Sequence, residues 1–224
     1  LLGGQVKVED LAPVGLRQLG IQEVDGVAMA APVCKRTLCL KAPMPAEDVL
    51  AEVAEGWRGR PGPVFLELPL DVQASQVPET WAAAGLNSGT DPERTAPLAS
   101  EQLVANVAAR IAAAERPVFL LGGGLSHRQA KALQSQLAAL SLPVMTTWNG
   151  ADRYAADHGN YAGRPNTWGQ RSSNLLLQQA DLVLAVGSRL GLQQTGFNWQ
   201  AFVPLGEVIQ VDIDPSELAK PNPL

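Results

Sequence analysis

The second half of the chain alternates apolar runs with amphipathic segments in a regular order. Residues 100–117, "SEQLVANVAARIAAAERP", carry apolar side chains at i, i+3, i+4 and i+7 behind a Ser that is typical of a helix N-cap, so they predict a helix. The apolar runs lack polar alternation, which is typical of parallel strands buried on both faces. The expected order is helix 100–117, strand 117–123, helix 126–140, strand 142–147, helix 172–180, strand 181–188 and strand 207–214. This order predicts an α/β fold with a doubly wound, Rossmann-like parallel sheet over residues 100–224.

The first half of the chain carries a shorter version of this pattern. Residues 46–59 repeat Ala, Leu and Val at helical spacing, and the run 62–70 is rich in Val, Phe and Leu, as in a buried strand. Residues 1–75 are therefore expected to be part of a second α/β domain. Residues 76–99 hold Pro, Gly, Ser, Asn and Thr without a sustained period, which predicts a linker along a surface.

The loops that follow the strands of the second half are the candidate ligand sites, because doubly wound sheets bind ligands at the carboxyl ends of their strands. These loops are 122–124, 146–149, 187–189 and 212–214. Gly122, Gly123 and Gly124 would let a ligand approach the backbone, and the N-terminus of the next helix suits a diphosphate. However, "GGGLSH" is neither G-x-G-x-x-G nor a phosphate-binding loop with its Lys, so a tight turn without a ligand explains the glycines equally well.

Two further loops carry charged side chains. Arg189 follows Gly187 by two residues, where it either covers an anionic or aromatic group or pairs with a surface carboxylate. Asp212 ends a strand, as the acceptors of ribose hydroxyls do. Asp214 precedes Pro215 and is interpreted as a helix N-cap. Taken with the glycines, these features indicate a nucleotide-containing cofactor.

Composition narrows the functional classes. The chain has 224 residues and a formal net charge of −5 without a basic run, so nucleic acid is not expected as a partner. No apolar segment approaches the roughly 20 residues that span a bilayer, so no membrane partner is expected. Cys34, Cys39 and two His argue against a four-ligand zinc site, and a reducing cytoplasm is the expected location. His127 and His158 have no nucleophile in a known motif and are expected at the surface or at helix caps.

Several stretches resemble one family. "GRPGPVFLELPLDVQ" (Gly59–Gln73) resembles the end of the pyrimidine-binding domain of thiamine diphosphate-dependent enzymes, close to the acetolactate synthase group, and Ile21–Lys41 is similar to the segment before it. "RPVFLLGGG", "NYAGRPNTWGQRSSNLLLQQADLVLAVGSRL" and "VIQVDIDPSEL" resemble the central domain that follows. The resemblance implies that residues 1–75 are the C-terminal part of the pyrimidine-binding domain, 76–99 a linker, and 100–224 the central, FAD- or nucleotide-binding-like domain.

The resemblance also implies an activity. The complete enzyme would use thiamine diphosphate and Mg²⁺ to decarboxylate a pyruvate-like 2-keto acid and transfer the two-carbon unit to a carbonyl acceptor, as a homodimer or homotetramer. The first residue is Leu rather than Met and no Gly-Asp-Gly occurs, so the chain is expected to be a fragment without the family's catalytic glutamate or metal ligands. The alternatives are a 2-keto acid or acyl-CoA decarboxylase or lyase of the same family, a degenerate member kept for regulation, and a non-catalytic nucleotide-binding module.

Cofactor-binding positions follow from the same resemblance, with FAD in the central domain and Gln22 facing the thiamine site. They are Gln22, Gly122, Gly123, Gly124, Thr146, Thr147, Trp148, Gly169, Gly187, Arg189, Asp212 and Ile213. The chain departs from the family where Met-His-Gly reads Thr167-Trp168-Gly169 and where the Asp-Asp-Arg after Gly-x-Arg reads Gly191-Leu192-Gln193. The second departure removes a positive charge from the flavin diphosphate region, and the pattern is that of an acetolactate synthase-like relative.

Overall fold

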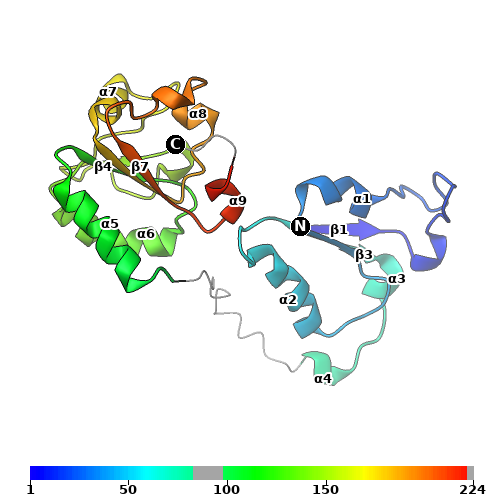
Figure 1. Ribbon diagram of the computed structural model, residues 1–224. Coiled ribbons are helices and arrows are strands. Elements are labelled where there is room, and N and C mark those ends of the chain that lie inside the picture. Colours follow the sequence, from blue (N-terminus) through cyan, green and yellow to red (C-terminus); the bar gives the residue numbers. More distant parts are fainter. Residues whose placement is uncertain (83–97, 221–224) are drawn as a thin grey trace. The chain divides into compact units, whose positions relative to one another are not determined.

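The computed structural model describes residues 1–82 and 98–220 of the chain. The chain divides into two compact units, Leu1–Ala96 (unit 1) and Pro97–Leu224 (unit 2), and each is described by itself (Figure 1). The segment 83–97, which makes up most of the expected linker, lies outside the described residues.

Unit 2 is built on one parallel sheet with helices on both faces. Its strands are β4 (Pro117–Leu121), β5 (Val144–Thr146), β6 (Leu182–Val186) and β7 (Glu207–Val211), in the order β5-β4-β6-β7. Its helices are α5 (Glu101–Ala113), α6 (His127–Ala139), α7 (Arg171–Gln179), α8 (Leu192–Thr195) and α9 (Pro215–Leu218), with 3-10 turns η4 (Trp148–Gly150) and η5 (Trp199–Ala201). The predicted α/β fold with a parallel sheet is confirmed.

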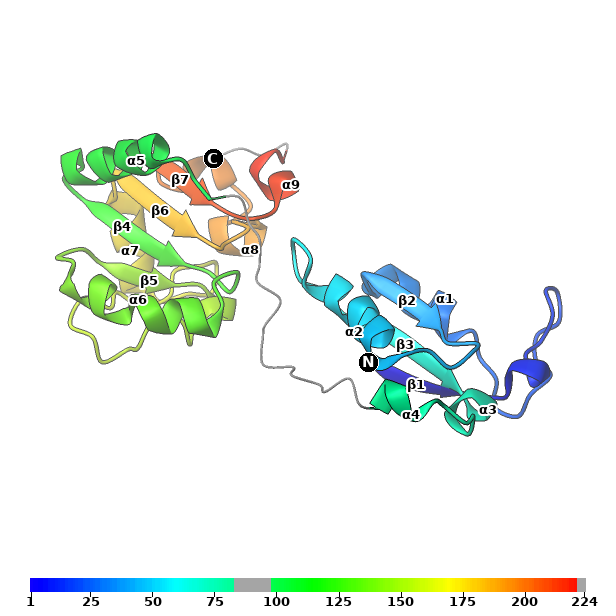
Figure 2. The same cartoon turned by 90° about the horizontal axis from the view of Figure 1, so that it is seen from below.

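The strand order places a switch point between β4 and β6. After β4 the chain passes through α6 to β5 on one side, and it then returns through α7 to β6 on the other side of β4. Because such crossovers are right-handed, this reversal puts α6 and α7 on opposite faces of the sheet, as Figures 1 and 2 show. The loops after β4 and β6 therefore begin at neighbouring strand ends, at the position where sheets of this kind bind ligands.

The core of unit 2 lies on both faces of the two central strands. Leu120 of β4 and Val183 and Ala185 of β6 are fully buried, as are Val144 and Met145 of β5. The absence of polar alternation in these strands is explained by this two-sided burial. Burial of four of the five side chains in each central strand fixes the positions of their carboxyl ends.

Unit 1 contains a smaller parallel sheet. Its strands β1 (Leu2–Gln5), β3 (Val64–Pro69) and β2 (Arg36–Cys39) lie in the order β1-β3-β2. Helices α1 (Gly26–Ala30) and α2 (Ala46–Ala54) lie on opposite faces in Figures 1 and 2, and η1 (Val8–Asp10), η2 (Ala31–Val33), η3 (Glu55–Trp57), α3 (Leu70–Gln73) and α4 (Glu79–Ala82) complete the unit. The central strand β3 provides most of the buried apolar side chains.

The sequence-based boundaries differ from the structure most clearly in unit 1. The helix expected over 46–59 ends at Ala54 and continues as η3, because Gly56 follows within two residues. Strands β1 and β2 were not expected, and α4 lies inside the segment 76–99 that was expected to be a linker. Short elements of four residues carry too little periodicity to be recognised.

The predicted caps are confirmed. Ser100 begins α5 and its side chain accepts a hydrogen bond from the Leu103 amide. Asp214 begins α9 and accepts from the Ser216 amide at 2.9 Å. These contacts satisfy amide groups that a helix leaves unpaired at its first turn.

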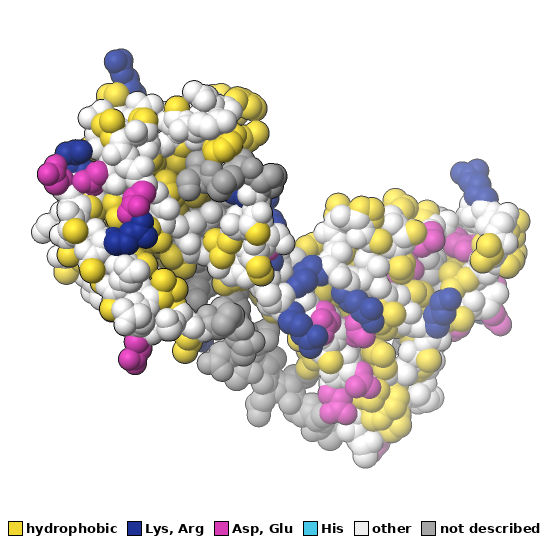
Figure 3. All heavy atoms as spheres, viewed as in Figure 1, with side chains coloured by type: hydrophobic (Ala, Val, Ile, Leu, Met, Phe, Trp, Pro, Cys, Tyr) yellow, Lys and Arg dark blue, Asp and Glu magenta, His cyan; other side chains and the backbone are white. Residues whose placement is uncertain are grey.

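The surface carries charges of both signs. On the face seen in Figure 3, basic (dark blue) and acidic (magenta) side chains lie intermixed on both units, among many hydrophobic ones (yellow). Within residues 1–82 and 98–220, no helix is long and apolar enough to cross a membrane.

Replacing Leu120 by Ala should destabilise unit 2 by about 3 kcal/mol in its free energy of unfolding, because the substitution opens a cavity between the central strands. The measurement is urea unfolding followed by circular dichroism. Leu133→Ala, at a position that is 39% exposed on α6, is the matched control and should cost about 1 kcal/mol or less. Equal losses in the two variants would show that β4 is not the centre of the core.

Candidate functional site

The glycine turns after β4 and β6 pack against each other, backbone to backbone. The amide of Gly122 donates to the Val186 carbonyl and that of Gly124 donates to the Gly187 carbonyl, both at 2.8 Å. A Cβ at Gly122 would lie 2.1 Å from the Gly187 oxygen, and Gly187 itself has a φ of +64°. Three of the predicted glycines are therefore required by the contact between the two loops, whether or not a ligand is present.

The middle glycine has a different neighbour. A Cβ at Gly123 would lie 2.7 Å from the carbonyl oxygen of Asn149, in the turn after β5. Gly123 is itself exposed, and its amide has no hydrogen-bond partner among the described residues. The triplet thus contacts the loops on both sides and leaves one N–H group available to an acceptor.

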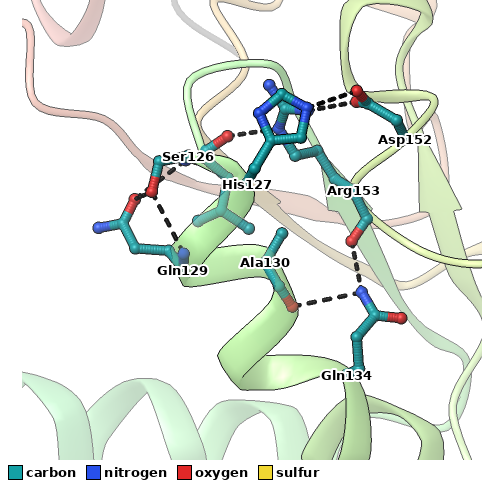
Figure 4. Close-up of polar contacts among 8 residues, drawn as sticks. Ser126, His127, Gln129, Ala130, Gln134, Asp152 and Arg153 are labelled. Carbon is teal, nitrogen blue, oxygen red and sulfur yellow. Dashed lines mark hydrogen bonds and ion pairs between the residues drawn. The ribbon is translucent and has the colours of Figure 1, made fainter.

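Arg153 fastens the β5 loop to the β4 turn (Figure 4). Its Nε donates to the Leu125 carbonyl at 2.5 Å, and its guanidinium also pairs with the Asp152 carboxylate. Its own carbonyl accepts from Gln134 Nε2 of α6 at 2.7 Å. Arg153 is 8% exposed, so these contacts hold a nearly buried cation between the β4 turn, the β5 loop and α6.

The other oxygen of Asp152 reaches the first residue of α6. His127 Nε2 lies 2.6 Å from Asp152 Oδ2 (Figure 4), and the hydrogen bond to His127 lowers the pKa of the Asp152 carboxyl, with Arg153 adding to the effect. The capping box of α6 lies beside this pair, since Ser126 and Gln129 exchange side-chain to backbone hydrogen bonds. His127 is exposed, as expected, and the Ser126 hydroxyl beside it bonds with Gln129.

The residues after β5 separate into buried and exposed positions. Thr146 is completely buried and Thr147 is 8% exposed, with the Thr147 amide donating to the Leu121 carbonyl at 2.9 Å. Trp148 is 57% exposed and stacks on Trp168, with ring centroids 6.3 Å apart and an interplanar angle of 15°. Of the three positions carried over for this loop, the structure therefore presents only Trp148 to solvent.

Gly169 closes the turn that carries Trp168. A Cβ at Gly169 would lie 2.4 Å from both the Arg164 oxygen and the Asn166 nitrogen, so this glycine is required by the turn itself. The amide of Gly169 donates to the Asn166 carbonyl at 2.9 Å. Gly169 supports the exposed indole of its neighbour.

Arg189 follows β6, at the carboxyl ends of the strands, and lines a cavity of about 500 Å³. The cavity is lined by Arg189, Gly191, Leu192, Phe197, Trp199, Glu217 and Lys220. Arg189 Nε lies 3.8 Å from a Glu217 oxygen, and Lys220 Nζ donates to the Arg189 carbonyl. Two cations and two aromatic rings thus meet one carboxylate at the ends of β6 and β7.

Asp212 and Ile213 come directly after β7. Asp212 Oδ1 accepts from the Asp214 amide at 2.9 Å, and Ile213 is 41% exposed. One carboxylate oxygen of Asp212 therefore stabilises the turn between β7 and α9 by accepting this hydrogen bond.

Gln22 lies in unit 1, in a loop held by its neighbour Glu23. The Glu23 carboxylate accepts from the amides of Ala12, Leu19 and Gly20 at 2.7, 2.8 and 3.0 Å. The Leu19 amide, followed by those of Ala12 and Gly20, lowers the pKa of Glu23. Gln22 has a φ of 60°, a left-handed conformation that this clamp maintains.

A cavity of about 800 Å³ opens beside Gln22. It is lined by Arg17, Gln18, Gln22, Glu23, Val24, Asp25, Ala28 and Met29. Glu23 is bound by backbone amides and Asp25 caps α1 through the Ala28 amide, so the carboxylates of this lining have local partners.

Several residues of these sites were not predicted from the sequence. Asp152, Arg153 and Glu23 act through contacts with other loops, and Trp168 was noted only as a departure from a family motif. In unit 1, Glu67 is 4% exposed beside Cys39, and burial, with a contribution from Glu67, raises the pKa of the Cys39 thiol. Among the described residues, no group of three His, Cys, Asp or Glu side chains is arranged to hold a metal ion.

The structure brings most of the predicted positions to one edge. All of them except Gln22 and Gly169 lie in the loops after β4, β5, β6 and β7 or, for Thr146, at the last residue of β5, and the turn of Gly169 joins this edge through Trp168. Gln22 belongs to the cavity of unit 1.

Comparison with known proteins gives one family. Residues 104–223 match the model of the thiamine pyrophosphate enzyme central domain. The chain is 33% identical over 202 residues to the acetolactate synthase isozyme 2 large subunit of Escherichia coli (strain K12), which covers 89% of this chain and 35% of that protein. It is 33% identical over 204 residues to the isozyme 1 large subunit of the same organism, covering 89% of this chain and 34% of that protein.

A more distant organism has a similar protein. The probable acetolactate synthase large subunit of Methanocaldococcus jannaschii is 29% identical over 201 residues, which cover 89% of this chain and 34% of that protein. The chain thus spans about a third of the length of the curated relatives it matches.

Replacing Gly122 by Ala should lower the free energy of unfolding of unit 2 by about 3 kcal/mol, because the new Cβ meets a backbone oxygen that cannot move aside. Urea unfolding measures the loss. Gly159→Ala is the matched control, since a Cβ there meets nothing within 4 Å, and it should change stability by about 1 kcal/mol or less. If Gly122→Ala were as stable as this control, the two turns would not be in contact.

The Asp152→Asn variant should lose the acid dependence that this carboxylate gives to unit 2. The folded-state pKa of Asp152 is depressed, so its stabilisation is present above the unfolded value of about 3.9 and is lost as the pH falls through the folded pKa. The melting temperatures of wild type and variant should therefore differ most near neutral pH and converge in acid. Asp157→Asn, on the same exposed segment, is the control, and a constant difference at every pH would contradict the assignment.

Proposed function

We propose a function from one premise: the chain belongs to the thiamine pyrophosphate-dependent enzymes, in their acetolactate synthase-like branch. The proposed activity is decarboxylation of a pyruvate-like 2-keto acid and transfer of the two-carbon unit to a carbonyl acceptor. The complete enzyme that contains this chain would carry out this reaction with thiamine diphosphate and Mg²⁺.

The observation that carries the proposal is the extent of the similarity. Identity of 33% to a protein named acetolactate synthase covers 89% of the chain, so it extends beyond the central domain match at 104–223 into unit 1. A nucleotide-binding module that shared only the doubly wound fold would give no reason for similarity in unit 1. We therefore interpret residues 1–75 as part of the pyrimidine-binding domain.

Unit 1 supplies the residue that we assign to the thiamine site. Thiamine diphosphate, when bound, provides the electron sink for cleavage of the bond next to the keto group. Gln22 reaches a cavity of about 800 Å³ with both polar and apolar lining, which fits a heteroaromatic group. Glu23 orients Gln22 by binding the backbone amides of its loop, and Val24, Ala28 and Met29 supply the apolar part of the cavity lining.

Unit 2 supplies the residues that we assign to FAD. The exposed amide of Gly123 offers a donor to a diphosphate, and Arg189 and Lys220 provide positive charge at the ends of β6 and β7. The family pattern has a second Arg where this chain has Gln193. Lys220 lines the cavity beside Arg189 and can supply the positive charge that this Arg would give. Asp212 keeps one carboxylate oxygen apart from its turn hydrogen bond, which suits a ribose hydroxyl.

The remaining expectations are part of the same proposal. We propose a homodimer or homotetramer in the cytoplasm, and we assign no residue of the described chain to Mg²⁺.

Replacing Gln22 by Gly in the complete enzyme should lower kcat/KM for the 2-keto acid by about 10- to 100-fold, because a positioning side chain is removed from the cavity. The fold should be retained, since Gly adopts a φ of 60° without strain. The measurement is CO₂ release and product formation from pyruvate with thiamine diphosphate and Mg²⁺ present.

The matched control is Gln102→Ala, at an exposed position of α5. Ala is used here because Gly would weaken the helix. This variant should retain wild-type kinetics. The proposed function fails if the wild-type enzyme neither binds thiamine diphosphate nor releases CO₂ from any 2-keto acid tested.

A further inference from the structure

Unit 1 buries a carboxylate that no cation neutralises. Glu67 lies on the central strand β3 and is 4% exposed. Within residues 1–82 and 98–220, no ion pair includes it. Its hydrogen-bond partner is the thiol of Cys39, the residue beside it on β2. Because a buried carboxylate is costly without a cation, the packing of an apolar core does not explain this residue.

The carboxylate lies directly under the first residue of α1. Helix α1 packs on β2 and β3 and covers one face of the sheet (Figures 1 and 2). A Cβ at Gly26 would lie 2.3 Å from Glu67 Oε1 and 3.3 Å from Phe65 Cζ. Gly26 therefore rests on these two side chains, and a shorter residue at position 67 would change its distance from the sheet.

The segment before α1 is held by a second buried polar side chain. Gln5 ends β1 and is 8% exposed, and its Nε2 donates to the Val24 carbonyl at 2.8 Å. Its Oε1 accepts from the Val6 amide at 2.9 Å, so both the oxygen and the nitrogen of this side chain are bonded. Two buried polar residues on adjacent strands, Gln5 and Glu67, thus contact residues 24 and 26.

The segment held in this way forms a wall of the cavity beside Gln22. Residues 24 and 25 precede Gly26 and residues 28 and 29 follow it, and all four line the cavity. Glu67 itself is not a lining residue, so it acts on the cavity through the position of this segment. A displacement of about 1 Å in a site can cost about 100-fold in activity, so the length of the side chain at position 67 is expected to matter.

We propose that Glu67 is a positioning residue of the thiamine site, an inference that rests on the thiamine site of the proposed function. The Glu67 carboxylate, packed under Gly26, sets the distance of α1 from the sheet and with it the position of the cavity wall at residues 24–29. The carboxylate acts through its length and not through its charge. Gln has the same length and can accept from the Cys39 thiol, so it should substitute for Glu67, whereas Asp should not.

The test is a titration of the complete enzyme, freed of its cofactor, with thiamine diphosphate in the presence of Mg²⁺. Glu67→Asp draws the carboxylate back by one methylene group, so the dissociation constant should rise about 10-fold. Glu67→Gln should keep the dissociation constant within about 3-fold of wild type. A loss in Glu67→Gln as large as that in Glu67→Asp would show that the charge matters and would overturn the proposal.

A double variant tests the contact with α1 directly. In Gly26→Ala the new Cβ meets the carboxylate, so the dissociation constant should again rise about 10-fold. When Gly26→Ala is combined with Glu67→Asp, the methyl group takes the space that the shorter side chain leaves, and the dissociation constant should return to within about 3-fold of wild type. Losses that multiply to about 100-fold in the double variant would contradict the contact and overturn the proposal.

Two controls separate positioning from stability. Gly4→Ala on β1 introduces a Cβ with nothing within 4 Å, and it should leave binding unchanged. Leu66→Val removes buried volume on the opposite face of β3, so it should destabilise unit 1 in urea and keep the dissociation constant within about 3-fold of wild type. An equal loss of affinity in Leu66→Val and Glu67→Asp would overturn the proposal, because destabilisation of unit 1 would then account for both.

The same titration distinguishes the inference from the proposed function. If the wild-type enzyme binds thiamine diphosphate and Glu67→Asp binds it equally well, the positioning role is wrong and the proposed function stands. If the wild-type enzyme binds no thiamine diphosphate, both are overturned.

Discussion

The contact between the two glycine turns at the switch point determines the geometry of the whole carboxyl edge of unit 2. Gly122 and Gly124 approach Gly187 so closely that no side chain fits between them. Because β4 and β6 are neighbours and most of their side chains are buried, the turns have little freedom to separate. The loop after β5 is then positioned against Gly123, and the Trp148 indole follows from that position.

Charged groups stabilise the loops that this contact leaves on the outside. Arg153 binds the Leu125 carbonyl and the Asp152 carboxylate while nearly buried, so it ties two loops together without an unpaired buried charge. In unit 1 the Glu23 carboxylate has the corresponding role. It accepts hydrogen bonds from three backbone amides that would otherwise have to be hydrated. In both units a single ionic side chain organises a loop that has no regular secondary structure of its own.

Sequence patterns predicted the parts of the structure that depend on local composition. The strands of unit 2 were predicted because burial on both faces removes polar alternation, and the caps at Ser100 and Asp214 because capping chemistry is local. Strands β1 and β2 were missed because each has four residues, and β1 contains Gly3 and Gly4, which are unfavourable in strands. The contact of Gly122 with Gly187 joins residues far apart in the chain, so it cannot be predicted from the local sequence of either turn. The stacking of Trp168 on Trp148 likewise joins two different loops.

Because the glycines pack against one another, they no longer count as evidence for a cofactor, and other residues have to supply it. The triplet first suggested a ligand because glycines allow close approach to the backbone, but in this structure Gly122, Gly124 and Gly187 are used to approach one another. These glycines are required for the fold, so they indicate neither the presence nor the absence of an FAD site. The argument for a bound dinucleotide passes instead to groups that the fold does not require: the exposed N–H of Gly123, the cations around the Arg189 cavity, and two stacked indoles left in water. The packing of the domain does not explain the arrangement of these groups along one edge, and they are the groups to which the proposed FAD is assigned.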